Sequence, residues 1–475
     1  MSKLINKTKI VATLGPASSD KETLLEMARN GMNVCRLNLS HGKHEDLEKV
    51  IHTIREINLE NNSHISILAD LQGPKIRTGE VQGGSVQLAS GSKIKFVVKK
   101  QLTNSETIFI NYKNFLNDVQ KGERVLIDDG KLVLEILDVD DTFAEAMVLF
   151  GGPLSSRKGV NLPNTKLSIP SLTPKDLIDL EFALKMDVRW IGLSFVRTAN
   201  DVLHLKELIH EAGKDSKVIA KIEKPEAVAD MDAIIDATDG IMVARGDLGV
   251  EIPMQDVPLI QKALVKKARK KFKPVIIATQ MMESMITNIS PTRAEVNDVA
   301  NAVMDGADAV MLSGETSVGD HPIEVIRAMY KIVTRTEEYK GIYFKDIKVR
   351  HSEERFVSDA ICKSEVELAQ NSEAKGIVTM TFSGYTTFRV ASYRPNCLIF
   401  VFTSNQKILD MLSLVWGVRG FYYNKFVSTD HTIEDVRKSL KKSGYVVDGD
   451  YVIHVASMPI SDKGSSNMLK LSLVH

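Results

Sequence analysis

The feature that most constrains the fold is a repeated alternation of short apolar strands with amphipathic helices. The first strand is expected over Lys9–Thr13, and a helix follows within residues 20–30. After an interruption the alternation resumes at Trp190–Phe195, and we count eight strand–helix units before about Glu337. Apolar strands that alternate with helices form parallel sheets, and eight such units favour a closed barrel over an open sheet. The chain is therefore predicted to be an α/β protein built on a (β/α)8 TIM barrel.

A Gly-punctuated segment rich in Val and Ile interrupts the alternation after the third strand. Ser92–Val98 and Arg124–Leu134 alternate with period two, which predicts a small all-β domain. Because it is inserted at the carboxyl end of a barrel strand, we expect it to form a lid over the active face. Beyond a charged linker, shorter helix–strand units predict a C-terminal open α/β domain for effector binding and assembly. The expected division is 1–75 for the first part of the barrel, 76–169 for the lid, 170–340 for the rest of the barrel and 345–475 for the C-terminal domain.

Composition excludes several classes of protein. Lys+Arg and Asp+Glu each number 61, so the net charge indicates neither nucleic acid nor a membrane surface as partner. No apolar stretch approaches the ~18 residues that a bilayer-spanning helix needs. The three cysteines, Cys35, Cys362 and Cys397, have neither disulfide nor metal-ligand spacing. Since the first strand begins too early to leave room for a signal peptide, a cytoplasmic protein with reduced thiols is expected.

Charged and hydroxyl side chains follow the predicted barrel strands, whose carboxyl ends meet on one face. These residues are Arg36, Asn38, Ser40, Asp70, Lys221, Glu223, Arg245, Asp247, Thr279, Gln280, Ser313 and Glu315. Each alone could be a solvated cap or half of a salt bridge, and helix capping is the better explanation for Thr279 or Ser313 taken singly. Their convergence on one face indicates a ligand-binding site.

The residue types at this face indicate a substrate that carries both a phosphate and a carboxylate. Glu223 and Asp247 are hard oxygen ligands suited to Mg²⁺ or Mn²⁺, with substrate oxygens completing the shell. Arg36 offers a planar fork that matches phosphate, and Lys221 is a point charge that would stabilise a phosphoryl group in transfer. Gly246 and Asp247 are expected to open a short helix whose free N–H groups would bind a carboxylate.

Several motifs in order resemble pyruvate kinases over essentially the whole chain. The matching segments are 8–18, 33–42, 158–163, 220–223, 242–249, 278–285 and 311–316. The resemblance implies a barrel, a β lid and a C-terminal α/β domain, usually assembled as a homotetramer. It implies transfer of a phosphoryl group from phosphoenolpyruvate to ADP, giving pyruvate and ATP in the last step of glycolysis, with allosteric activation by a phosphorylated metabolite. The chain looks like a bacterial, K⁺-independent type, and no further domain is expected after His475.

The resemblance also implies roles for individual residues. The substrate would be held by Arg36, Lys221, Gly246, Asp247 and Thr279, and the catalytic residues would be Lys221, Arg36, Thr279 and Ser313. Glu223 and Asp247 would bind Mg²⁺. The nucleotide would lie between barrel and lid, near Asn38, Ser40, His41, Arg77 and Lys158, and the Asp128–Asp129 turn would descend as the cleft closes. Thr279 and Ser313 are candidates for the relay that protonates the enolate, since Lys221 beside two carboxylates should stay charged.

Many members of this family bind K⁺ beside the phosphate. The resemblance implies a monovalent-cation pocket at Asn38, Ser40, Asp70 and Leu71. Lys75, however, stands where K⁺-dependent relatives usually carry Glu. An ammonium on the protein would attract phosphate and ADP without added salt, so we predict that K⁺ is not strictly required. The alternative is that Lys75 is a solvated lysine at the hinge of the lid.

A second site is expected in the C-terminal domain. The resemblance assigns a loop between a strand and a helix to a phosphorylated effector, with residues 464–466 closing over it. The loop residues are Thr381, Ser383, Gly384 and Thr386. Phe382 and Tyr385 stand where basic residues are often found, which favours a sugar monophosphate or AMP over fructose bisphosphate. The alternative is an ordinary helix cap without an effector.

Two other functions fit part of the pattern. A metal-dependent aldolase or lyase acting on an enolate of pyruvate would share the barrel chemistry, but it has no use for a lid with Lys158 and Arg77. A catalytically inactive, effector-binding scaffold is the third possibility. The presence of Arg36, Lys221 and Glu223 argues against it.

Overall fold

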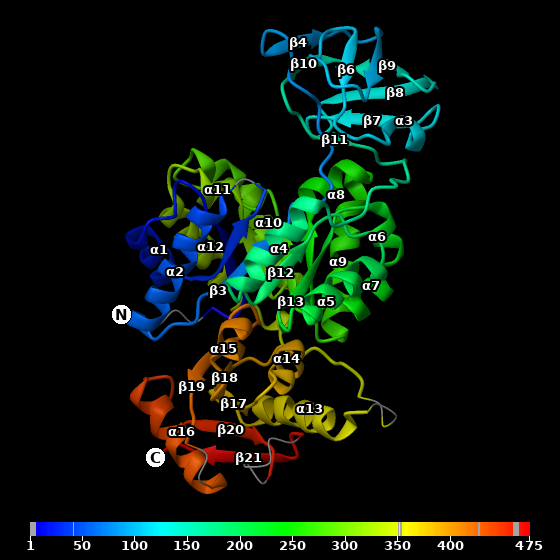
Figure 1. Cartoon of the computed structure of the whole chain (residues 1–475). Helices are drawn as coiled ribbons and strands as arrows, with labels where there is room; N and C mark the ends of the chain where they lie inside the picture. The colour runs from blue at the N-terminus through cyan, green and yellow to red at the C-terminus, as the bar shows by residue number, and fades with distance from the viewer. Residues whose placement is uncertain (1–5, 41, 350, 352–353, 426–427, 459–464) are drawn as a thin grey trace.

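The computed structural model describes residues 6–40, 42–349, 351, 354–425, 428–458 and 465–475. His41 and Gly464, to which binding roles were assigned, lie outside the described residues. Three parts follow one another along the molecule, with the lid above the barrel and the C-terminal α/β part below it (Figure 1). No helix in the described ranges has the length and apolar character needed to cross a bilayer.

Eight parallel strands close into a barrel, which confirms the predicted (β/α)8 fold. In sheet order they are β1 (Lys9–Thr13), β16 (Ala309–Leu312), β15 (Val275–Ala278), β14 (Gly240–Ala244), β13 (Lys217–Ile222), β12 (Trp190–Leu193), β3 (Ser66–Asp70) and β2 (Met32–Asn38). Their residues are almost all buried, because one side faces the barrel interior and the other faces the helices. This burial explains why the strands are apolar throughout instead of alternating.

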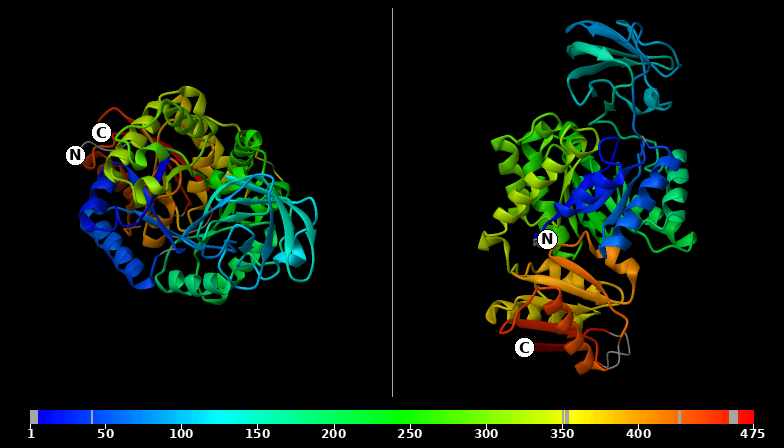
Figure 2. Two further views of the ribbon diagram at one scale, coloured as in Figure 1. Left: turned by 90° about the horizontal axis from the view of Figure 1, so that it is seen from above. Right: turned by 90° about the vertical axis from the view of Figure 1, so that its left-hand side faces the viewer.

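Helices surround the barrel, as the view from above shows (Figure 2, left). They are α1 (Lys21–Arg29), α2 (His44–Asn61), α4 (Pro174–Lys185), α5 (Ala199–Glu211), α6 (Pro225–Ala229), α7 (Met231–Ala237), α8 (Arg245–Glu251), α9 (Val257–Lys270), α10 (Arg293–Asp305), α11 (Gly314–Ser317) and α12 (Pro322–Thr336). Local sequence sets their ends: Thr173 and Asp176 form a capping box at α4, and Asn62 in a left-handed conformation ends α2.

The lid consists of two small sheets around their own apolar core. One sheet has the order β11 (Val160–Asn161), β7 (Arg124–Ile127), β8 (Leu132–Val139), β9 (Ala144–Phe150), β5 (Lys93–Val97) and β6 (Thr107–Phe109), and the other pairs β10 (Gly152–Ser155) with β4 (Ser85–Leu88). The short helix α3 (Phe115–Asp118) brings Phe115 against Phe96 in this core. The predicted all-β insertion is therefore confirmed.

The C-terminal part is a five-stranded sheet with helices on its faces. Its order is β19 (Val418–Tyr422), β18 (Leu398–Thr403), β17 (Gly376–Met380), β20 (Tyr451–Ala456) and β21 (Met468–Leu473), and only β21 runs antiparallel. Its helices are α13 (Phe356–Asn371), α14 (Tyr385–Ser392), α15 (Gln406–Leu412) and α16 (Thr429–Lys442). The sheet is separate from the barrel, as expected for an open α/β domain.

The C-terminal part is nevertheless packed tightly against the base of the barrel. Trp190 Nε1 donates a 3.1 Å hydrogen bond to Met411 O, and Arg394 forms a 2.9 Å ion pair with Asp308. One hydrophobic cluster contains both barrel-interior residues such as Ile219 and residues of the C-terminal sheet. The two parts therefore share a core.

Candidate active site

Lys221 is the centre of a charged cluster at the carboxyl end of the barrel. The Lys221 Nζ atom lies 2.9 Å from Glu223 Oε1 and 3.3 Å from Asp70 Oδ1. It also donates a 2.7 Å hydrogen bond to Ser194 Oγ. Ser194, which was not predicted as a site residue, itself donates a 2.7 Å hydrogen bond to Leu71 O. The ends of β13, β3 and β12 therefore meet at one ammonium group.

Arg36 joins the same cluster from β2. Its Nε donates a 2.7 Å hydrogen bond to Asp70 Oδ2, and its Nη1 donates a 3.0 Å bond to Thr13 Oγ1. Asp70 is 2% exposed and accordingly holds two cations, Arg36 and Lys221, side by side. Such a pair presents two positive charges to an anion while a buried carboxylate fixes their positions.

The electrostatics of the cluster follow from burial and mutual charge. Burial acts to raise the pKa of Asp70, but Lys221 and Arg36 outweigh it and hold that pKa below its usual range. Burial acts to lower the pKa of Lys221, but Asp70 and Glu223 outweigh it and raise the pKa to about 12. Burial raises the pKa of Glu223, and the negative charge of Asp247 adds to this while Lys221 opposes it. Lys221 is therefore a fixed cation at neutral pH.

Glu223 and Asp247 fit the role of ligands to a divalent cation. Glu223 Oε2 accepts a 2.7 Å hydrogen bond from Phe195 N, whereas its buried Oε1 faces the Lys221 ammonium at 2.9 Å. Asp247 stands in the first turn of α8, and its charge acts on both Glu223 and Lys221. No set of three or more His, Cys, Asp and Glu among the described residues could hold a metal ion. Two carboxylates would leave the remaining positions to substrate oxygens and water.

Thr279 connects β15 to the start of α8. Thr279 and Gln280 both have left-handed backbones, with φ of 70° and 53°. Arg245 stabilises this conformation, since its Nη2 donates a 2.8 Å hydrogen bond to Thr279 O. Gly246 N donates a 2.6 Å bond to Thr279 Oγ1. Gly246 and Thr279 were both expected to bind the substrate carboxylate. In this structure the Gly246 N–H is bonded to the Thr279 hydroxyl instead.

Ser313 lies at the end of β16 and makes no side-chain capping hydrogen bond to α11, so the capping alternative does not explain it. Ser313 N instead donates a 2.6 Å hydrogen bond to Glu315 Oε2, and Met282 N donates a 3.2 Å bond to Glu315 Oε1. Burial raises the pKa of Glu315. Glu315 therefore fixes the backbones that follow β15 and β16.

The residues expected to form the monovalent-cation pocket are close together but already engaged. Asn38 Oδ1 accepts a 3.1 Å hydrogen bond from Ser40 N, and Leu71 O accepts from Ser194. Asp70 is paired with the two cations described above.

The expected nucleotide residues come from two parts of the molecule. Asn38 and Ser40 are on the barrel, whereas Arg77 and Lys158 are in the lid, which stands raised from the barrel (Figure 2, right). Lys158 Nζ lies 2.9 Å from Asp128 Oδ1, and this hydrogen bond lowers the pKa of Asp128. Asp128 and Asp129 both have left-handed backbones at the turn between β7 and β8. No hydrogen bond or ion pair within the described ranges joins the lid pair to the barrel pair.

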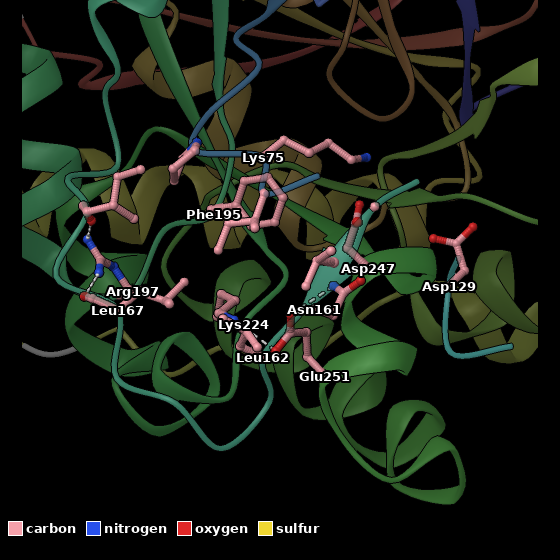
Figure 3. A pocket seen from close by; sticks show the side chains of 15 residues that line it. Lys75, Asp129, Asn161, Leu162, Leu167, Phe195, Arg197, Lys224, Asp247 and Glu251 are labelled. Atoms are coloured by element: carbon pink, nitrogen blue, oxygen red, sulfur yellow. Dashed lines mark hydrogen bonds and ion pairs between the residues drawn. The ribbon is translucent and has the colours of Figure 1, made fainter. Parts of the chain in front are cut away.

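A pocket lies beneath the hinge of the lid, between the lid and α8 (Figure 3). Lys75 and Asp247 line it, together with Asp129 from the lid. At its floor Lys224 Nζ lies 2.8 Å from Glu251 Oε2, and Asn161 Nδ2 donates a 2.9 Å hydrogen bond to Glu251 Oε1. None of these last three residues was predicted. The available signal was that Lys224 directly follows Glu223 and that Glu251 lies one helical turn after Asp247.

The lid is also held where its chain returns to the barrel. Arg197 donates hydrogen bonds of 2.6 Å to Leu167 O and 2.7 Å to Ile169 O (Figure 3). Phe195, two residues earlier, has a left-handed backbone with φ of 53°. The predicted strand Trp190–Phe195 accordingly ends at Leu193.

The expected effector loop uses most of its hydroxyls internally. Thr381 Oγ1 accepts a 2.9 Å hydrogen bond from Gly384 N, and Thr386 Oγ1 lies 2.8 Å from Ser466 Oγ. Ser383 is exposed. The expected contact with residues 464–466 therefore exists at Ser466.

Two family models match most of the chain. Residues 5–326 match the model described as the barrel domain of pyruvate kinase, and residues 359–472 match the one described as its alpha/beta domain. The chain belongs to the pyruvate kinase family. It therefore has phosphotransferase activity with phosphoenolpyruvate and ADP as implied substrates, and the lyase and the inactive scaffold are set aside.

Individual relatives agree with this assignment. The chain is 43% identical to a pyruvate kinase of Geobacillus stearothermophilus over 474 residues, covering 98% of this chain and 80% of the relative. It is 42% identical to that of Corynebacterium efficiens over 468 residues, covering 98% of each. Among solved structures, a pyruvate kinase from Cryptosporidium parvum superimposes with a TM-score of 0.91 at 36% identity, covering 99% of this chain and 96% of that one.

Proposed function

We propose that this enzyme transfers the phosphoryl group at the cluster centred on Lys221. The observation that carries the proposal is that the Lys221 ammonium lies between Asp70 and Glu223 while Arg36 is bonded to the same Asp70. Two fixed cations, the buried Lys221 and the half-buried Arg36, stabilise the charge on a phosphoryl group in transfer without having to reorient.

Mg²⁺ or Mn²⁺ would be held by Glu223 and Asp247 and would supply charge neutralisation. The substrate carboxylate would bind at the first turn of α8, where Asp247 N has no partner within the helix and Thr279 can release Gly246 N. The enolate left after transfer takes a proton at carbon. Because its pKa is about 12, Lys221 is a poor acid at neutral pH, and the hydroxyls of Thr279 and Ser313 are the candidates for the relay.

ADP would bind between barrel and lid, near Asn38, Ser40 and His41 on one side and Arg77 and Lys158 on the other. Lys158 would exchange its contact with Asp128 for a phosphate oxygen as the lid descends. The division at residues 76–169 would make the lid the moving part, with 1–75 and 170–340 forming the barrel and 345–475 the C-terminal domain.

We further propose that the enzyme works without K⁺. One support is that Lys75 lines the same pocket as Asp247. The other is that the oxygens of Asn38 and Leu71 already accept hydrogen bonds and that Asp70 is already ion-paired. Steady-state rates should be retained when Na⁺ or tetramethylammonium replaces K⁺. A collapse of activity in either salt would contradict the proposal.

For regulation and assembly, we propose a cytoplasmic homotetramer that is activated by a sugar monophosphate or AMP at the loop with Thr381, Ser383, Gly384 and Thr386. Among these, Ser383 is the exposed hydroxyl. Rate curves against phosphoenolpyruvate, with and without each phosphate, test the activation, and sedimentation tests the tetramer.

The test of the active site is a coupled assay for pyruvate from phosphoenolpyruvate and ADP, with and without Mg²⁺. Lys221→Met should lower kcat about 10²–10³-fold, the range seen when one preorganised charge-stabilising group is removed. Lys266→Met, an exposed lysine of α9, is the matched control and should leave kcat unchanged. Full activity of Lys221→Met would refute the assignment.

A further inference from the structure

A groove lies between the base of the barrel and the C-terminal domain, far from the active face. Lys217, Lys271 and Lys273 line it from the barrel, and Arg355, Ser383 and Tyr385 line it from the C-terminal domain. In Figure 1 this is where α14 approaches the barrel from below. Ser383 belongs to the expected effector loop, so the groove continues that loop toward the barrel.

The groove has an excess of positive charge. Four cations face one carboxylate, Asp239, and that carboxylate is already paired with Lys206 at 3.1 Å. Lys273 Nζ donates a 2.6 Å hydrogen bond to Thr238 O, and burial lowers its pKa. Lys217 and Lys273 therefore lie partly out of water, where their attraction for an anion is stronger, whereas Lys271 and Arg355 are exposed.

Two of the four cations are available to a ligand. Lys271 is paired with Asp236 at 2.7 Å. The Lys217 ammonium, by contrast, has no hydrogen bond or ion pair with any described residue. The Arg355 guanidinium lies over the ring of Tyr385, 4.4 Å from its centroid, and makes no ion pair within the same ranges. Lys217 and Arg355 thus approach the groove from its two sides.

The C-terminal wall of the groove is held rigidly against the barrel. Tyr385 OH donates a 2.7 Å hydrogen bond to Asp359, which also pairs with Arg389. The Arg389 guanidinium in turn lies 3.2 Å from the ring centroid of Phe272, a barrel residue. The Ser383 hydroxyl is therefore presented to the groove by a fixed loop.

We propose that this groove binds the phosphate group of a small phosphorylated metabolite, held by Lys217, Arg355 and the Ser383 hydroxyl. The inference deepens the effector site proposed above and rests on it. It adds Lys217 from the barrel and Arg355 from just before α13 to a loop that carries Phe382 and Tyr385 in place of basic residues. A ligand in the groove would be coupled to the active face through one strand, because β13 begins at Lys217 and carries Lys221 near its other end.

Ligand binding to the full-length enzyme tests the groove. Ribose 5-phosphate, AMP and inorganic phosphate are titrated calorimetrically with Mg²⁺ and phosphoenolpyruvate present and ADP omitted, so that the active-site anion position is filled. Lys217→Ala and Arg355→Ala should each raise the Kd of the probe that binds about tenfold or more, as expected for the loss of a charge-assisted hydrogen bond. Lys217→Arg should restore binding. Lys270→Ala, an exposed α9 lysine outside the groove, should leave the Kd unchanged.

The outcomes separate this inference from the proposals on which it rests. An unchanged Kd in Lys217→Ala and Arg355→Ala, together with weakened binding in Thr381→Ala, would place the effector within the C-terminal domain and overturn the groove alone. Failure of every probe to bind the parent enzyme would overturn both the groove and the effector site. Pyruvate formation, measured separately, tests the active site and does not depend on either result.

Discussion

The buried ion pair beneath the hinge of the lid allows a quantitative test. The side chains of Lys224 and Glu251 are 4% and 2% exposed, with 2.8 Å between Nζ and Oε2. Glu251 also accepts the hydrogen bond of Asn161, the last residue of β11 in the lid. One carboxylate therefore connects the lid to the end of α8, four residues from Asp247.

Glu251→Gln would leave the Lys224 ammonium buried without a counter-charge. Removing one partner of a buried pair costs about 3–5 kcal/mol, because the remaining charge stays out of water. At roughly 2–4 °C per kcal/mol for a domain of this size, the barrel transition should fall by about 6–20 °C. Calorimetry measures this shift, with fluorescence of the two buried tryptophans, Trp190 and Trp416, as a second probe. Lys224→Met combined with Glu251→Gln removes both charges and should recover most of the loss.

The surface pair of Lys271 and Asp236 provides the control. Its side chains are 55% and 57% exposed, so Asp236→Asn should change stability by less than about 1 kcal/mol. The reasoning would be refuted if Glu251→Gln were as mild as Asp236→Asn. It would equally be refuted if the double variant were no more stable than Glu251→Gln, since an unpaired buried charge would then not be the cause.

Three further predictions concern other parts of the molecule. Lys75→Glu should make the rate depend on added K⁺, and an equal rate in KCl and tetramethylammonium chloride would contradict this. Lys158→Met should raise the KM for ADP about tenfold, the loss expected for one charge-assisted contact, and a larger change in the KM for phosphoenolpyruvate would speak against a nucleotide contact. Burial lowers the pKa of His454 to about 3 from 6.5, so the unfolded chain binds the proton first and stability falls as pH drops from about 6.5 toward 3, by about 1.4 kcal/mol per unit. His454→Leu should flatten the change in urea midpoint between pH 7.5 and 5.5, whereas the exposed control His204→Gln should keep the parent's slope.

The barrel and the convergence of its charged residues could be predicted because both depend on local patterns. An apolar strand is recognisable from its own residues, and the carboxyl ends of parallel strands must meet on one face. Lys221 and Glu223 could therefore be placed together before their 2.9 Å contact was known. The lid was recognisable for the same reason, since the period of its strands differs from that of the helices around it.

What the sequence could not supply were conformations and partners decided by distant residues. The left-handed backbone of Thr279 depends on a hydrogen bond from Arg245, and nothing in the local sequence indicates it. The bond from Gly246 N to Thr279 Oγ1 likewise joins two different strand–helix units. Ser194 was missed because serine near a strand end is usually a turn residue, and its contact with Lys221 exists only in the closed barrel.

The shared core at the base of the barrel limits how this enzyme can be divided. The Trp190 indole donates a hydrogen bond to Met411 O, and the Asp308 carboxylate accepts hydrogen bonds from Arg394 and from Trp416 N. A truncated catalytic fragment that ends before α13 would expose this interface between barrel and C-terminal domain to water. It would also leave buried polar groups without hydrogen-bond partners. Chimaeras between homologues should consequently exchange the barrel and the C-terminal domain together. The lid has a core of its own and is therefore the unit suited to separate replacement.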